Sequence, residues 1–128
     1  MKTGIAILVV SESSLKLSLT IAKHLPGSNL YSSFESIFTD TIPSIATFLK
    51  EHFNRFEAFV FVGSLGICVR SIAPFITDKH TDPAIVNIDS TGKYIVSVLS
   101  GHIGGANSLT KQIARITGGQ AVITTQSD

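Results

Sequence analysis

The chain has 128 residues, the length of one domain, and its 44% hydrophobic and 15% charged content excludes an intrinsically disordered protein. A formal net charge of +1, with no block of basic residues, argues against binding to nucleic acid, which needs a clear positive patch. No apolar run approaches the roughly 20 residues of a membrane-spanning helix, so we expect no membrane partner. The single cysteine, Cys68, can form no internal disulfide, and no cleavage site follows the first apolar run. These features favour a cytoplasmic protein.

The first half of the chain alternates apolar runs with helical patterns. Residues 4–10 form a continuous apolar run that predicts a buried strand. A helix is expected after Ser13 as its N-cap, and residues 29–32 are expected to form a short edge strand. Thr41 is the expected cap of a second helix, and residues 58–62 predict another buried strand.

The second half contains a hairpin signal. Residues 84–88 and 93–99 predict two strands, and the Asp89-Ser90-Thr91-Gly92 segment between them is typical of a hairpin turn. The remaining expected elements are a short helix ending near Pro74, a polar loop at 78–83, a helix ending at Gly118–Gly119 and a strand at 121–124.

This order predicts an α/β fold with three layers, built on a mostly parallel sheet with one antiparallel hairpin. We expect a single α/β domain over residues 1–128. The chain stops directly after its last strand, which is the expected appearance of a boundary inside a longer protein.

Two glycine turns carry most of the chemical information. Gly63-Ser64-Leu65-Gly66 and Ser100-Gly101-His102-Ile103-Gly104-Gly105-Ala106-Asn107 each follow a strand and precede a helix. Ligands of parallel sheets bind outside the carboxyl ends of the strands, so we expect both turns to line one crevice. Backbone N–H groups at a helix start, with a histidine that titrates near neutral pH, suit a carboxylate or a developing oxyanion.

Several polar residues have two interpretations. Arg70 can pair with a structural carboxylate such as Asp78 or Asp82, or with a substrate carboxylate. Asp78 and Lys79 lie in a loop that either folds over the crevice or is only solvated, and His80 is expected to be merely exposed. His102 is the sharpest candidate for proton transfer, although a histidine here can also bond only the backbone. Asn107 can orient a ligand or stabilise the helix start.

Three segments in this order resemble one known family. They are Gly66-Ile67-Cys68-Val69-Arg70-Ser71-Ile72-Ala73-Pro74, Asp78-Lys79-His80-Thr81-Asp82-Pro83-Ala84 and the Ser100–Asn107 turn. Together they are similar to the cobalt-precorrin-5A hydrolase (CbiG) family of anaerobic cobalamin biosynthesis. The resemblance covers nearly the whole chain, with Cys68 standing where an aliphatic residue is typical.

The resemblance implies a reaction and a set of roles. The substrate would be a cobalt corrinoid whose δ-lactone is opened, with release of acetaldehyde to give cobalt-precorrin-5B. His102 is expected as the general base, assisted by Asp78 or Asp82. Because the substrate carries the cobalt, no cofactor and no protein metal site are expected. The expected substrate-binding residues are Gly63, Gly66, Arg70, Lys79, Ser100, Gly101, Gly104, Gly105 and Asn107, with the N–H groups of Gly104 and Gly105 on the oxyanion.

The resemblance also leaves alternatives open. The resemblance implies that full-length family proteins carry a further C-terminal domain, which we expect this chain to lack, and that related modules are fused to other cobalamin enzymes such as a precorrin-4 methyltransferase. Other cobalamin-biosynthesis enzymes, or a fused domain, are therefore expected partners. A non-catalytic corrinoid-binding module is the main alternative function. An unrelated nucleotide or anion binder is the third.

Overall fold

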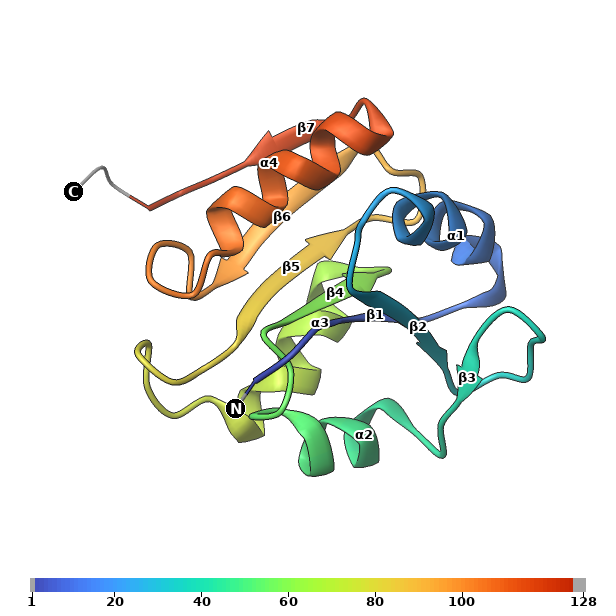
Figure 1. Ribbon diagram of the computed structural model, residues 1–128, viewed down its shortest axis with the longest axis horizontal. Helices are drawn as coiled ribbons and strands as arrows, with labels where there is room; N and C mark the ends of the chain where they lie inside the picture. Colours follow the sequence, from blue (N-terminus) through green and yellow to red (C-terminus); the bar gives the residue numbers. More distant parts are fainter. Residues whose placement is uncertain (1, 126–128) are drawn as a thin grey trace.

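A computed structural model describes residues 2–125 as one seven-stranded sheet with helices on both faces (Figure 1). The strand order is β3-β2-β1-β4-β5-β6-β7, and every pairing is parallel except β5 with β6. The strands are β1 (Ile5–Val9), β2 (Ser28–Ser32), β3 (Asp40–Thr41), β4 (Ala58–Val62), β5 (Ala84–Ile88), β6 (Tyr94–Leu99) and β7 (Gln120–Val122). The predicted α/β fold, mostly parallel with one antiparallel hairpin, is confirmed.

The helices divide between the two faces of the sheet. They are α1 (Leu15–Lys23), α2 (Ile45–His52), α3 (Leu65–Ile72) and α4 (Ala106–Thr117), with short 3₁₀ turns at Glu12–Ser14 and Ala73–Phe75. Among residues 2–125, no helix is long and apolar enough to cross a membrane.

The side chains on the two faces of the central strands form two separate hydrophobic cores. Alternate side chains of a strand point to opposite faces. Ile7 and Val60 therefore pack with α1 and α4, whereas Phe61 packs with α2 and α3. Because β1, β4 and β5 are covered on both sides, β1 and β4 are continuous apolar runs, and β5 is interrupted only by the buried Asn87.

Two expected helix starts were wrong. Helix α2 is capped by Ser44, whose Oγ accepts a hydrogen bond from the N–H of Thr47 at 3.0 Å. The residue before a proline is held in an extended conformation, so the chain cannot enter a helix until it has passed Pro43. Thr41 instead belongs to β3, which pairs with β2 and forms the sheet edge, so the edge position expected for residues 29–32 was wrong.

Helix α1 begins at Leu15 rather than directly after Ser13, because a 3₁₀ turn intervenes. Its geometry is held by the Ser14 hydroxyl, which donates to the carbonyl oxygen of Ser11 at 2.8 Å. The last strand is also shorter than expected and ends at Val122.

Asp89 organises the hairpin between β5 and β6. Its carboxylate accepts hydrogen bonds from the N–H of Tyr94 at 2.6 Å, from the N–H of Thr91 at 3.1 Å and from the Thr91 hydroxyl. Partial burial alone would raise the pKa of Asp89, but these hydrogen bonds outweigh it and lower the pKa below its usual value.

We predict that Asp89→Asn lowers the free energy of unfolding at pH 7. A carboxyl whose folded pKa is depressed stabilises the fold above its unfolded pKa, about 3.9 for Asp, and loses that contribution as pH falls through the folded value. Denaturant melts from pH 7 to pH 2 should show an acid-dependent loss in the wild type that is smaller in Asp89→Asn. Glu51→Gln, on the exposed face of α2, is the control; equal pH profiles for all three proteins would contradict the role of Asp89.

Candidate functional site

The two glycine turns lie at opposite ends of the sheet. Val62 pairs with Ile88 and Ile88 pairs with Ile95, so the end of β4 lies at the same level as the start of β6. The turn that follows Leu99 lies at the other end, beside the beginning of β5. The expected shared crevice is therefore wrong, because the hairpin reverses β6 and its carboxyl end meets the amino ends of the parallel strands.

The candidate residues consequently fall into two groups. Gly63, Gly66 and Arg70 belong to the turn and helix that follow β4. The other group comprises Asp78, Lys79, Asp82, Ser100, Gly101, His102, Gly104, Gly105 and Asn107, all in the segments that precede β5 or follow β6.

At the end of β4, Gly63 is held by close packing and backbone bonding. A Cβ at this position would lie 3.0 Å from the Cβ of Val10, and its N–H donates to Ile88 O at 2.9 Å. Buried Asn87 donates from Nδ2 to Gly63 O at 3.3 Å, while its buried Oδ1 has no hydrogen-bond partner among residues 2–125. These contacts fix the start of α3, which Ser64 caps by accepting from Ile67 N–H at 3.3 Å.

Arg70 turns back along α3 towards its first turn. A Cβ at Gly66 would lie 3.5 Å from Nη1 of Arg70, so the guanidinium lies against this glycine. The carboxylate of Asp82, one of its two expected structural partners, is occupied within its own loop. The arginine is exposed, which leaves its donors accessible to an external carboxylate.

The loop before β5 is built around the carboxylate of Asp82. This buried side chain is 4% exposed and accepts from Thr77 N–H at 3.0 Å, Thr77 Oγ1 at 3.0 Å and Asp78 N–H at 3.2 Å. Asp78 is exposed and accepts from the N–H of His80 at 3.1 Å. The geometry gives Asp82 a loop-forming role; its expected assistance to the general base remains a prediction.

The histidine turn satisfies much of its own backbone. Ala106 N–H donates to Ser100 O at 3.1 Å and Asn107 N–H donates to Gly101 O at 2.9 Å, which uses two of the first N–H groups of α4. A Cβ at Gly104 would lie 2.5 Å from the Cβ of Ser100, so a side chain cannot fit there without a shift of the backbone. Gly104 is thus required by the packing of the turn, and Gly105 by its positive φ of 88°, whatever ligand the turn meets.

Asn107 connects three segments. Its Oδ1 accepts from Ser97 Oγ at 2.7 Å, and its Nδ2 donates to Thr125 Oγ1 at 2.8 Å. Ser100 adopts a positive φ of 59° and donates from Oγ to Asp82 O at 3.2 Å. Asn107 therefore stabilises the start of α4, and Ser100 joins the turn to the loop before β5.

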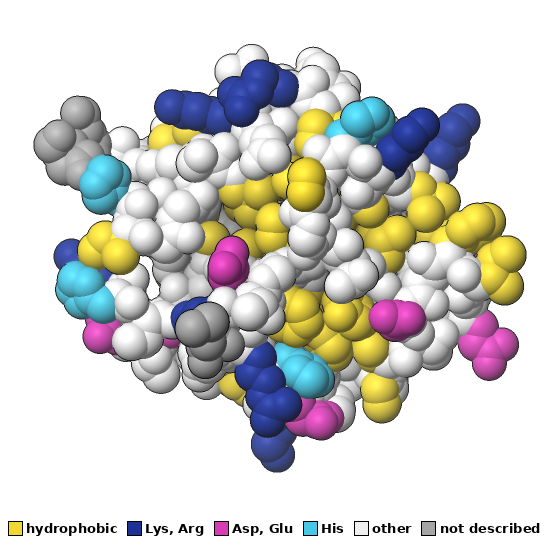
Figure 2. All heavy atoms as spheres, viewed as in Figure 1, with side chains coloured by type: hydrophobic (Ala, Val, Ile, Leu, Met, Phe, Trp, Pro, Cys, Tyr) yellow, Lys and Arg dark blue, Asp and Glu magenta, His cyan; other side chains and the backbone are white. Residues whose placement is uncertain are grey.

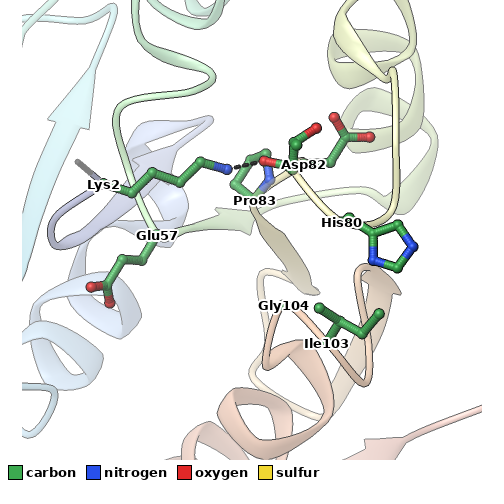
Figure 3. A pocket seen from close by; sticks show the side chains of 8 residues that line it. Lys2, Glu57, His80, Asp82, Pro83, Ile103 and Gly104 are labelled. Carbon is green, nitrogen blue, oxygen red and sulfur yellow. Dashed lines mark hydrogen bonds between the residues drawn. The ribbon is translucent and has the colours of Figure 1, made fainter.

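A cavity of about 420 Å³ lies between that loop and the histidine turn (Figure 3). Lys2, Glu57, His80, Ile103 and Gly104 line it, and Lys2 Nζ donates to the carbonyl oxygen of Thr81. Lys2, Glu57 and His80 were missed as site residues, because nothing in their sequence spacing indicates that the fold brings them together. His102 is exposed beside Ile103 in the same turn.

No group of three or more His, Cys, Asp or Glu side chains suited to a metal ion occurs within residues 2–125. On the face shown in Figure 2, Lys and Arg side chains lie at separate places around the rim, interspersed with acidic ones. This face presents no continuous basic patch.

Comparison with known proteins identifies the family. The family model described as cobalamin synthesis G N-terminal matches residues 47–128. The chain belongs to this family. A crystal structure of a Sulfolobus solfataricus homologue of cobalamin biosynthesis protein G has the same fold, with a TM-score of 0.77 and 26% identity over 94% of this chain and 36% of that one.

Curated relatives match the same family. The chain is 47% identical over 79 residues to the cobalt-precorrin-5A hydrolase of Salmonella typhimurium, covering 62% of this chain and 22% of that enzyme. It is 48% identical over 85 residues to the cobalt-precorrin-5A hydrolase of Priestia megaterium, covering 66% of this chain and 23% of that enzyme. The chain thus spans about a fifth of the length of these relatives.

We predict that Asp82→Ala destabilises the fold by about 1–3 kcal/mol, because it removes the hydrogen bonds that the buried carboxylate accepts from Thr77 and Asp78. Asp78→Ala removes an exposed carboxylate from the same loop and should cost much less. Denaturant melts of both variants provide the measurement. Equal losses would show that Asp82 does not hold the loop.

Proposed function

We propose that this chain acts in cobalamin biosynthesis as part of a cobalt-precorrin-5A hydrolase, which opens the δ-lactone of cobalt-precorrin-5A and releases acetaldehyde. The observation that carries the proposal is the 47–48% identity to two enzymes of that name. The matched family region, residues 47–128, includes both glycine turns and the loop before β5. Cobalt enters this reaction with the substrate.

The chemistry requires a base and a site for negative charge. Water adds to the lactone carbonyl carbon as the base takes its proton, and the carbonyl oxygen becomes an oxyanion before the ring C–O bond breaks. The cavity between the histidine turn and the loop before β5 is at the small end of the usual 300–1,000 Å³ range for ligand sites. It would accept the lactone edge of the macrocycle rather than the whole ring.

His102 is our first candidate for the base, and His80 is the second. His102 is exposed in the turn whose Ile103 and Gly104 line the cavity, and His80 lines the cavity from the opposite loop. The N–H groups of Gly104 and Gly105 are the proposed oxyanion donors. Asp82 would act as a positioning residue, since its carboxylate holds the loop that carries His80.

A non-catalytic corrinoid-binding module is the second candidate. It is favoured by the inward hydrogen bonding of the site: two N–H groups at the start of α4 and the Asp82 carboxylate already have partners within the chain. In that case another polypeptide, either a separate cobalamin enzyme or a fused domain, would supply the missing groups. A cytoplasmic location would suit either candidate.

The test is acetaldehyde release from cobalt-precorrin-5A. It should be measured for the 128-residue chain and for the Salmonella enzyme with its matching segment replaced by this chain. We predict that the chimera is active and that His102→Gln slows it by about 10²–10⁴-fold, the usual contribution of a general base. Substrate affinity should be retained, because glutamine keeps a hydrogen-bonding group.

His80→Gln and His24→Gln in the same chimera separate the alternatives. His24, at the end of α1, donates from Nδ1 to the Thr20 carbonyl oxygen at 3.1 Å and serves as the control. A large loss in His80→Gln alone would transfer the base to the loop before β5. Full activity of both the His80 and His102 variants would contradict a catalytic role for this cavity.

A further inference from the structure

Within residues 2–125, no helix covers one face of the sheet at the start of β6. Helix α4 packs on β6 from one side, where Ile95 is fully buried. Helices α2 and α3 occupy the other side, where they pack mainly over β1, β4 and β5, and Val98 and Leu99 at the end of β6 lie at the margin of that core. On that side Tyr94 is 48% exposed, and Val96 and Val98 are only partly buried.

The flank of α3 next to this face is also apolar. Cys68 and Ile72 point into the core, and Leu65 and Val69 stand beside them, one turn apart, at 43% and 46% exposure. In a right-handed β4–α3–β5 crossover, the flank that carries Leu65 and Val69 is the one turned towards β6. An exposed apolar strip therefore continues from α3 onto β6.

Two cations border this strip. Arg70 lies over Gly66 at the first turn of α3, and Lys93 Nζ lies 5.3 Å from the centre of the Tyr94 ring at the start of β6. The nearby carboxylate of Asp89 is already bonded to Thr91 and Tyr94. The strip therefore combines an apolar floor with positive charge at its rim.

We infer that this α3–β6 surface, formed by Leu65, Val69, Arg70, Tyr94, Val96 and Val98, binds the macrocycle of a corrinoid that carries free carboxylates. The inference rests on the proposed function and adds to it where the body of the substrate binds. The apolar side chains would cover one face of the ring, and Arg70 and Lys93 would bind peripheral carboxylates. A protein partner fits less well, because Arg70 and Lys93 favour a ligand that carries negative charges around an apolar centre.

The position of β6 explains how binding and chemistry would connect. This strand begins next to Lys93 and ends at the histidine turn. Its six residues span roughly 20 Å at about 3.3 Å per residue. A macrocycle that lies along β6 could therefore extend one edge towards His102 while Arg70 holds another.

The binding test uses cobyrinic acid, a cobalt corrinoid with free carboxylates, and cobinamide, whose side chains are amidated. Leu65→Asp and Val69→Asp should each weaken cobyrinic acid binding at least tenfold, measured by absorbance titration and calorimetry of the full chain. Arg70→Ala should weaken cobyrinic acid at least tenfold but change cobinamide affinity little, since cobinamide lacks the carboxylates. Raised salt should weaken cobyrinic acid in the wild type more than in Arg70→Ala.

Matched controls are available on other surfaces. Ile37→Asp places the same charge at a residue that is 94% exposed in the 33–39 loop, and Arg115→Ala removes a cation from the last turn of α4. Both should bind cobyrinic acid like the wild type, and circular dichroism melts should show that every variant folds.

Three outcomes would overturn the inference. The first is cobyrinic acid binding that the Leu65, Val69 and Arg70 variants leave unchanged, which would move the macrocycle to another surface. The second is that the wild type does not bind cobyrinic acid. The third is that Leu65→Asp loses self-association but keeps its cobyrinic acid affinity, which would show that a second copy of the chain occupies this surface. None of these decides the proposed function, because acetaldehyde release by the chimera is measured separately.

Discussion

The antiparallel pairing of β5 with β6 determines how the rest of this structure is arranged. Five strands run in one direction, and the four-residue turn at 89–92 sends β6 back along the sheet. The carboxylate of Asp89 closes that turn through hydrogen bonds to Thr91 and Tyr94. Because β7 pairs in parallel with β6, the reversal places the carboxyl ends of the last two strands, and the turn between β6 and α4, beside the amino ends of the other five strands.

The reversal separates two kinds of glycine turn. After β4, the chain turns into α3 in the manner of a parallel α/β unit, with a serine cap and an arginine lying over the first turn. After β6, the chain meets the loop that leads into β5, and Ser100 bonds directly to the backbone of Asp82. The cavity lined by Lys2, Glu57, His80, Ile103 and Gly104 exists because these two segments meet.

Much of the polar chemistry at this meeting point is used internally. Asp82 holds its own loop, Asn107 joins β6 to the segment after β7, and the turn carbonyls satisfy the start of α4. Such bonding positions the exposed histidines on a rigid support, which a proton-transfer site needs. It also leaves few polar groups free to bind a large substrate at this end of the sheet. The proposed α3–β6 surface would supply the additional binding contacts.

The sequence by itself determined the class of fold, the order of its elements and the family. Short apolar runs rich in β-branched residues predict strands covered on both faces, and the Asp89–Gly92 segment predicts a tight reversal. The family resemblance was readable because its three motifs are continuous in the chain. Even the separation of the two glycine turns follows from the predicted hairpin, because an antiparallel β6 must end beside the amino ends of the parallel strands.

Only the tertiary structure decided which distant residues meet and what the polar ones bond. Lys2, Glu57 and His80 lie far apart in the chain, and no local pattern indicates that they line one cavity with the histidine turn. The role of Asp82 depends on burial and on three donors that arrive through the loop conformation. The bare face of β6 is likewise invisible in its sequence, because a strand's pattern records its own apolar residues but not whether a helix lies over them.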